Sequence, residues 1–276
     1  MLRKLVKYDF NYYIKYWLIA AITTIGLAVV CGFCFKILSI NNDKLDVLKV
    51  LCMLAGVISA VAIFGLMIFT RVLAVVRYYK NLFTDEGYLT FTLPVKFSEH
   101  LLAKVFVNYF FTVVSSVVVV LDFFIVLLLA IPEQLFNPNN WKDIIEMLGE
   151  LFAEIKIFTP LYALQFLLFM LALPLLQIMI DYCCITVAAT LVRKYKVLVA
   201  IGIYYGTSVI ISYFSQFAVM SFASESVINT IEKLSENQIM GMISIVFLAI
   251  TALVILVSLI LFTLSLHLVN TKLNLD

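Results

Sequence analysis

Charged residues are what this sequence lacks most. Only 13% of its 276 residues are Asp, Glu, Lys or Arg, whereas 64% fall in the hydrophobic set, and mean hydropathy is +1.10. Soluble domains contain about 25% charged residues. A soluble fold of this length would have too little polar surface to cover so many apolar side chains. The net charge of +2 is also too small to indicate a nucleic-acid partner. The composition therefore predicts an integral membrane protein.

The sequence also lacks the common motifs of catalysis and metal binding. It has no GxxxxGK[ST] to hold ATP phosphates, no HExxH and no GxSxG, and its only histidines are His100 and His267. The five cysteines lie in apolar runs, and the CxxC of Cys31 and Cys34 has no second pair that would complete a zinc site. We expect no catalytic residue, no metal and no cofactor on this chain.

Six apolar segments are long enough to cross a bilayer, which takes roughly 20 helical residues. They cover about residues 17–38, 50–70, 105–131, 157–182, 197–220 and 242–264. These segments predict an all-α, polytopic protein with six transmembrane helices in one membrane domain over residues 1–276. In residues 1–16, apolar side chains recur at three- and four-residue steps. This pattern predicts an amphipathic entry helix on the inner leaflet, and a plain cytosolic extension of the first span is the alternative.

The basic residues predict the orientation of the chain. With a cytoplasmic N-terminus, 13 of the 19 Lys and Arg residues lie on the inner side and 6 on the outer side. Cytoplasmic loops are enriched in Lys and Arg, so we expect both termini to be cytoplasmic. Residues 71–104 then form a cytoplasmic segment, and residues 132–156 and 221–241 form outer loops.

Two acids lie in or near the predicted spans, at Asp122 and Asp181. A charge at the bilayer centre costs about 2.5–3.5 kcal/mol on insertion scales, so Asp122 is expected to face the bundle or to be protonated. A pair of aspartates would suit an intramembrane enzyme. The predicted spans place these two in different halves of the bilayer, so the enzyme is the least favoured interpretation.

The most informative pattern lies in the inner segment LFTDEGYLTFTLPVKFSEHLLAK, Leu82 to Lys104. It has acids beside a glycine, then Leu93-Pro94-Val95, then a Leu-rich stretch that ends in Lys104. This segment resembles the inner loop of type-2 ABC exporter permeases. The opening MLRKLVKYDFNYYIKYW is similar to the entry helix of such permeases, particularly those from Firmicutes. Six spans and inner termini fit that family over the whole chain.

The resemblance implies a transport subunit rather than an enzyme, in a cell membrane that is the plasma membrane of a bacterium. Two permease subunits, as a homodimer or a heterodimer, would sit in the lipid bilayer on two copies of an ABC ATPase that binds ATP and Mg. The cargo would be amphipathic or hydrophobic, such as an antimicrobial or toxin-like peptide or a drug. A motor-free membrane immunity or sensor protein is the alternative.

Carried over from the family, the inner segment would dock in a groove of the ATPase. Asp85 and Glu86 would lie near its basic residues, and Gly87 would allow a backbone turn that a side chain forbids. A basic turn at Arg193 and Lys194 would make a lesser contact. The residues implied for ATPase coupling are Thr84, Asp85, Glu86, Gly87, Tyr88, Leu89, Thr90, Phe91, Thr92, Leu93 and Pro94, together with Arg193 and Lys194.

The fifth span contains two further patterns. Gly202 and Gly206 form a GxxxG, which lets helices approach closely, either at the pathway, at a dimer seam or within the subunit. The aromatic residues Tyr204, Tyr205 and Phe214 would line an apolar pathway or pack within the core. Asp122 is a further candidate for the pathway or the dimer packing.

Overall fold

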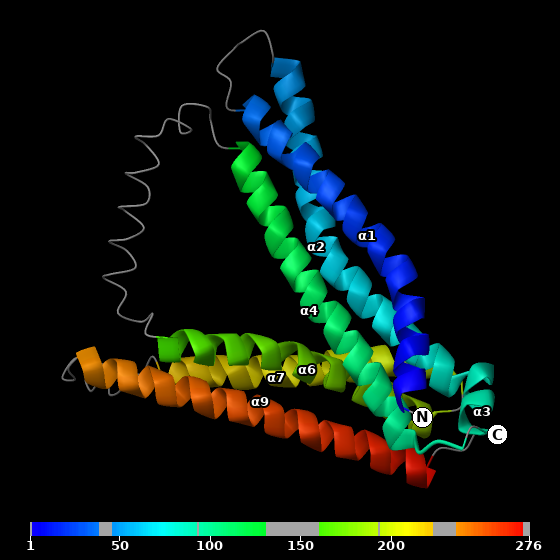
Figure 1. Ribbon diagram of the computed structural model, residues 1–276. Helices are drawn as coiled ribbons and strands as arrows, with labels where there is room; N and C mark the ends of the chain where they lie inside the picture. The colour runs from blue at the N-terminus through cyan, green and yellow to red at the C-terminus, as the bar shows by residue number, and fades with distance from the viewer. Residues whose placement is uncertain are drawn as a thin grey trace. The chain divides into compact units, whose positions relative to one another are not determined.

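The computed structural model describes residues 2–38, 46–92, 94–130, 160–192, 194–222 and 236–272, and these are helical almost throughout. The helices are α1 (Leu2–Leu38), α2 (Asp46–Phe83), α3 (Asp85–Thr92), α4 (Phe97–Ala130), α6 (Pro160–Leu191), α7 (Lys196–Phe222) and α9 (Glu236–Lys272) (Figure 1). All except α3 are long and apolar enough to cross a membrane, and no strand occurs in the described ranges. The predicted all-α fold with six spans is confirmed, and the chain is a multi-pass membrane protein.

Most of the helices are longer than the spans that hydropathy predicts. At 1.5 Å per residue, the 37 residues of α1 extend over about 55 Å, well beyond the roughly 30 Å of hydrocarbon. Residues 1–16 were expected to form an amphipathic entry helix or a plain cytosolic extension of the first span, and α1 runs unbroken from Leu2 through both stretches. Residues 221–241 were expected to be a loop, but α7 continues to Phe222 and α9 begins at Glu236. The expected outer loop 132–156 lies outside the described residues.

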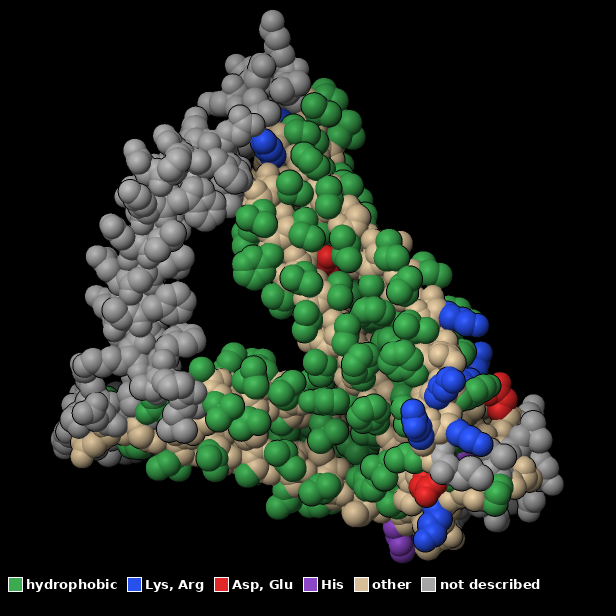
Figure 2. Space-filling model, viewed as in Figure 1, with side chains coloured by type: hydrophobic (Ala, Val, Ile, Leu, Met, Phe, Trp, Pro, Cys, Tyr) green, Lys and Arg blue, Asp and Glu red, His purple; other side chains and the backbone are tan. Residues whose placement is uncertain are grey.

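Of the two compact units in the chain, unit 1 comprises Met1–Val76 and Phe106–Lys156, and unit 2 comprises Arg77–Val105 and Ile157–Asp276. Hydrophobic side chains cover much of the visible face of the helices (Figure 2), as expected where a helix meets lipid.

Unit 1 is a three-helix bundle of α1, the first part of α2 and most of α4 (Figure 1). Its best-packed part is an aromatic cluster in which Tyr13 stacks on Phe111, with ring centroids 5.3 Å apart, and Ala74 and Val107 fill the remaining core. Phe10 also packs on Phe111, at 5.1 Å. The apolar face that the sequence assigned to the inner leaflet therefore contacts α2 and α4.

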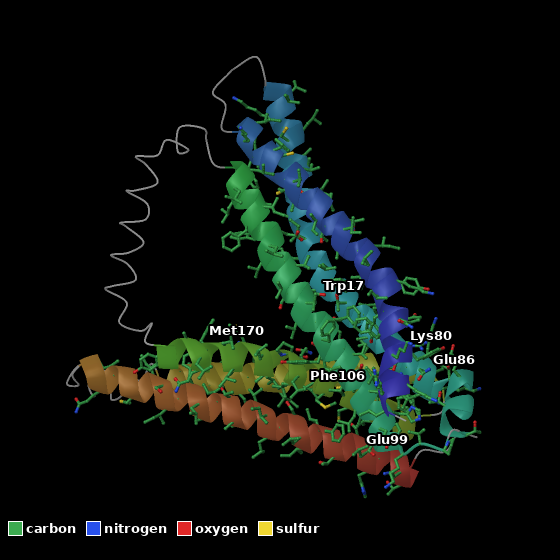
Figure 3. The ribbon with its side chains drawn as sticks, in the orientation of Figure 1. Trp17, Lys80, Glu86, Glu99, Phe106 and Met170 are labelled. Carbon is green, nitrogen blue, oxygen red and sulfur yellow. The ribbon has the colours of Figure 1, made fainter. Side chains whose placement is uncertain are left out.

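A chain of hydrogen bonds joins the three helices of unit 1 just above this cluster. The indole N–H of Trp17, a residue labelled in Figure 3, donates to Ser115 Oγ (2.7 Å). The hydroxyl oxygens of Ser115 and Thr70 are 2.8 Å apart. Thr70 Oγ1 donates to the carbonyl of Leu66 (2.8 Å), so Ser115 must donate to Thr70. Each hydroxyl proton in this series of hydrogen bonds thus has a defined acceptor. The series links α1 to α4 and α4 to α2.

This arrangement predicts a large effect of Ser115→Ala. The substitution leaves the indole N–H of the half-buried Trp17 without its acceptor, which costs about 1–3 kcal/mol of unfolding free energy. Thermal unfolding in detergent measures the loss. Ser116→Ala is the matched control, because the Ser116 hydroxyl bonds only its own helix, at Val113 O. Adding Trp17→Phe to Ser115→Ala should recover part of the loss, and no recovery would contradict the assigned directions.

Unit 2 is built around the second half of α6. From Ile178 to Ala188 almost every side chain of this helix is buried. Helices α7 and α9 pack along α6. Toward the start of α6, the Gln165 amide donates to Ser244 Oγ (2.8 Å) and accepts from it (3.0 Å), and Phe169 meets Phe247 edge-on at 5.7 Å. A reciprocal polar pair of this kind fixes the register of α6 against α9 in an apolar setting.

Candidate functional site

The candidate site is the elbow of unit 2, which we define as residues 77–104 at the end of α2, in α3 and at the start of α4. Only Thr84 separates α2 from α3, and its hydroxyl bonds Lys80 O at the end of α2. The N–H of Gly87 donates to Thr84 O (2.7 Å), which starts α3. Thr90 Oγ1 reaches back to Asn81 O (3.0 Å) as well as to Glu86 O (2.9 Å). These bonds fold α3 back onto the end of α2.

Gly87 is the residue that permits this fold. A Cβ built at Gly87 would lie 2.5 Å from the carbonyl oxygen of Leu82 and 2.8 Å from its carbonyl carbon. No described glycine has a positive φ, so the expected turn conformation is not the reason for glycine here. The reason is space, because the backbone of α3 touches the backbone of α2 at this point. Both residues are buried.

The outward side of the elbow is polar. Glu86, labelled in Figure 3, is exposed. Thr92 and Pro94 are also exposed, and Thr84 and Thr90 are half-buried. Glu86 is therefore an acid that unit 2 presents to solvent on α3. The side chains of Asp85, Tyr88, Leu89, Phe91 and Leu93, which the sequence also assigned to docking, lie outside the described residues.

The inward side of the elbow is anchored to α6 by an aromatic pair that the sequence did not reveal. Tyr78 stacks on Tyr182 with ring centroids 3.9 Å apart and an interplanar angle of 9°. Thr186 Oγ1 donates to Tyr182 O (2.8 Å), so the Tyr78 hydroxyl, 2.9 Å away, donates to Thr186. Phe83 meets Tyr78 edge-on at 5.6 Å. Tyr78 and Thr186 are 0% exposed.

The second predicted contact, the basic turn, lies between α6 and α7. Lys194 is exposed there, and Arg193 lies outside the described residues. The turn is tight, since the next residue, Tyr195, has a φ of 60° and its carbonyl accepts from Val199 N at the start of α7. This is the one non-glycine residue with a positive φ in the described part of the chain.

The residues of α7 that were predicted for a pathway or a dimer seam are mostly uncovered by the described part of the chain. No described atom comes within 4 Å of a Cβ built on Gly202 or Gly206, so the GxxxG does not pack against the described part of this chain. Tyr205 and Phe214 are 66% and 73% exposed, and Tyr204 is half-buried. Packing against the described part of the chain therefore does not explain Gly202, Gly206, Tyr205 or Phe214, and a pathway or dimer role stays a prediction.

The two intramembrane acids belong to different units. Asp122 is 0% exposed in unit 1, and Asp181 is 7% exposed in unit 2, where the Gln177 amide donates to it at 3.3 Å. No group of three His, Cys, Asp or Glu side chains suited to a metal ion occurs among the residues that were described.

Comparison with protein-family models, with curated proteins and with solved structures finds no match to this chain.

Proposed function

We propose that this chain is the membrane subunit of an ATP-driven ABC exporter and that α3 docks onto a separate ATPase. The observation that supports the proposal best is the elbow itself. A short helix is locked against the end of a span by Gly87 and Thr90, and it offers the exposed Glu86. A turn that merely joined two spans would need neither the backbone contact nor the helix.

A rigid elbow suits the transmission of force. A slack loop absorbs a push at its tip, whereas a helix with fixed ends passes the displacement to its neighbours. Here α3 is bonded to α2 through Thr90 and Asn81, and α4 begins within five residues of its end. Tyr78 ties the same elbow to α6. Movement of α3 would therefore reach three spans directly.

The negative charge of Glu86 indicates that the docking partner should present a basic surface. An exposed ion pair stabilises a complex by about 0–1 kcal/mol. Truncation of an acid that is desolvated against a basic groove costs about 2–5 kcal/mol of binding free energy. The proposed partner is an ABC ATPase, in two copies that bind ATP and Mg. A second permease subunit completes the pathway, for an amphipathic or hydrophobic cargo, in a bacterial plasma membrane.

The test begins with a search of the neighbouring reading frames for an ABC ATPase, which is then co-expressed and co-purified with this chain. We expect the complex to survive sizing chromatography, to hydrolyse ATP, and to lose at least tenfold in assembly with Glu86→Ala, which corresponds to about 1.4 kcal/mol. Glu99→Ala is the matched control, because it removes the same charge from the neighbouring helix α4. Purification without any bound ATPase would contradict the proposal and favour the motor-free immunity or sensor protein.

The proposal also requires the elbow to face the cytosol. Val47, at the start of α2, is 77% exposed, and Tyr195, after the end of α6, is 80% exposed. All five native cysteines are buried, which keeps the labelling background low. A membrane-impermeant thiol reagent applied outside intact cells should label Val47→Cys and spare Tyr195→Cys. The reverse pattern would overturn the orientation.

A further inference from the structure

The interior of unit 1 holds an acid to which the proposed function gives no defined part. Asp122, in the second half of α4, is 0% exposed. Neither Oδ1 nor Oδ2 has a hydrogen-bond partner among the described residues. Buried polar groups in proteins are nearly always paired, and a buried charge without a partner is the costliest exception. The lack of partners on both oxygens therefore calls for a physical explanation.

The helix register places Asp122 opposite Thr24. Two contacts between α1 and α4 bracket this pair along the helices. Before it, Trp17 bonds Ser115, and after it, a Cβ built on Gly32 would lie 2.5 Å from Cβ of Leu129. Helices α1 and α4 therefore run parallel and in close contact. Two such helices repeat their contacts every seven residues. Thr24 lies seven residues after Trp17, and Asp122 lies seven residues after Ser115. The buried side chains of the neighbouring stretches of α1 and α2 include the small or apolar Ala21, Ala28, Ile63 and Leu66.

The hydroxyl protons around this level already have acceptors. Thr24 Oγ1 donates to Ala21 O at 2.9 Å, and Ser59 Oγ lies 2.8 Å from Ala55 O. Ser115 donates to Thr70, as the direction of the hydrogen-bond chain requires. A carboxylate can only accept, so an ionised Asp122 would have to draw the Thr24 hydroxyl proton away from Ala21 O. A protonated Asp122 fits better, because its own O–H can donate to the remaining lone pairs of Thr24 Oγ1.

No charge on the packed helices compensates an ionised Asp122 either. Residues 17–35 of α1 and 50–70 of α2 contain no Asp, Glu, Lys, Arg or His, and Asp122 is the only such residue between 105 and 130 of α4. The titratable groups on these stretches are the thiols of Cys31, Cys34 and Cys52 and the phenol of Tyr109. None of them is a cation that could balance a carboxylate within the hydrocarbon.

We propose that Asp122 is an intramembrane proton-binding site. It holds a proton on one carboxyl oxygen while α1, α2 and α4 are packed together. It releases that proton to water when α1 and α4 separate and water reaches the carboxylate. Opening of unit 1 is thereby coupled to proton release, and a rise in pH favours the open form. This inference does not rest on the exporter proposal, since it concerns unit 1 alone.

The test uses dicyclohexylcarbodiimide, an apolar reagent that reacts with protonated carboxyls in apolar surroundings. The full-length protein in lipid vesicles is treated over a series of pH values, and the adducts are mapped by peptide mass. We expect an adduct on Asp122 that is lost as pH rises, and none at that position in Asp122→Asn. Asp181 is the internal control, because it is also buried but has the Gln177 amide as a donor, and it should react far less.

The proposal is overturned if Asp122 forms no adduct at any pH. It is also overturned if a water-soluble carbodiimide modifies Asp122 as readily as the apolar reagent, because the site would then be open to water. Mapping in the parent protein decides the matter even if Asp122→Asn fails to fold. No ATPase is present in the assay, so its result is separate from that of the exporter test.

Discussion

Gly87→Val should abolish the coupling of ATP hydrolysis to transport while leaving expression and membrane insertion intact. The valine Cβ would start 2.5 Å from the carbonyl oxygen of Leu82, which belongs to the backbone and cannot rotate aside. Helix α3 must then move away from α2, and the bond from Thr90 to Asn81 is lost with it. Overpacking of this kind costs about 1–3 kcal/mol. The readouts are ATP hydrolysis by the reconstituted complex and its assembly on a sizing column.

The chain contains a matched control for this substitution. Gly87→Ala and Gly202→Ala make the same chemical change inside a helix, but no described atom lies within 4 Å of the added methyl group at Gly202. Gly202→Ala should leave stability unchanged or raise it by up to about 1 kcal/mol, because alanine favours the helix. Gly87→Ala should instead lower it. If the Gly87 variants assemble and hydrolyse ATP like the parent, the elbow is only a connector.

Tyr78→Ala should be the most destabilising single substitution in unit 2. It removes a fully buried ring that stacks on Tyr182 and meets Phe83, and it leaves a cavity between α2 and α6. Truncation of a buried aromatic residue costs about 3–5 kcal/mol of unfolding free energy. The midpoint of thermal unfolding in detergent reports the loss, and proteolysis at the elbow should become faster.

Two further variants separate the contributions of Tyr78. Tyr78→Phe keeps the stack and removes only the hydrogen bond to Thr186, which is worth about 0.5–1.5 kcal/mol. Tyr213→Ala removes a tyrosine that is 70% exposed and should be almost silent. Equal effects of Tyr78→Ala and Tyr213→Ala would show that the stacked pair does not hold the elbow.

The six spans were predictable because they are the parts of the chain that carry almost no charge over about 20 residues. Hydropathy marks only the part of a helix that lies in hydrocarbon, so it ended the second span at residue 70 although α2 continues to Phe83. Residues 71–83 include Arg71, Arg77 and Lys80, which are good helix formers outside the membrane. The burial of Asp122 was expected on the cost of exposing a charge to lipid.

The details of the elbow depended on contacts that no local pattern encodes. Gly87 drew attention in the sequence, but its steric role depends on where Leu82 O lies in the folded chain. Tyr78 and Tyr182 are far apart in sequence and neither belongs to a motif, so their stack could not be foreseen. The GxxxG at Gly202 and Gly206 has no close neighbour in the described part of the chain, so its role at a pathway or a dimer seam stays a prediction.

The hydrogen bond of Trp17 in unit 1 provides an intrinsic fluorescence probe of the helix bundle. The sequence has two tryptophans, Trp17 and Trp141, so a Trp141→Phe chain would emit from Trp17 alone. The indole of Trp17 bonds Ser115 on α4, and its ring lies 5.5 Å from that of Phe111 on the same helix. Any separation of α1 from α4 must break this bond and wet the indole. Its fluorescence colour and lifetime would therefore follow the opening of the bundle in real time, without an attached dye.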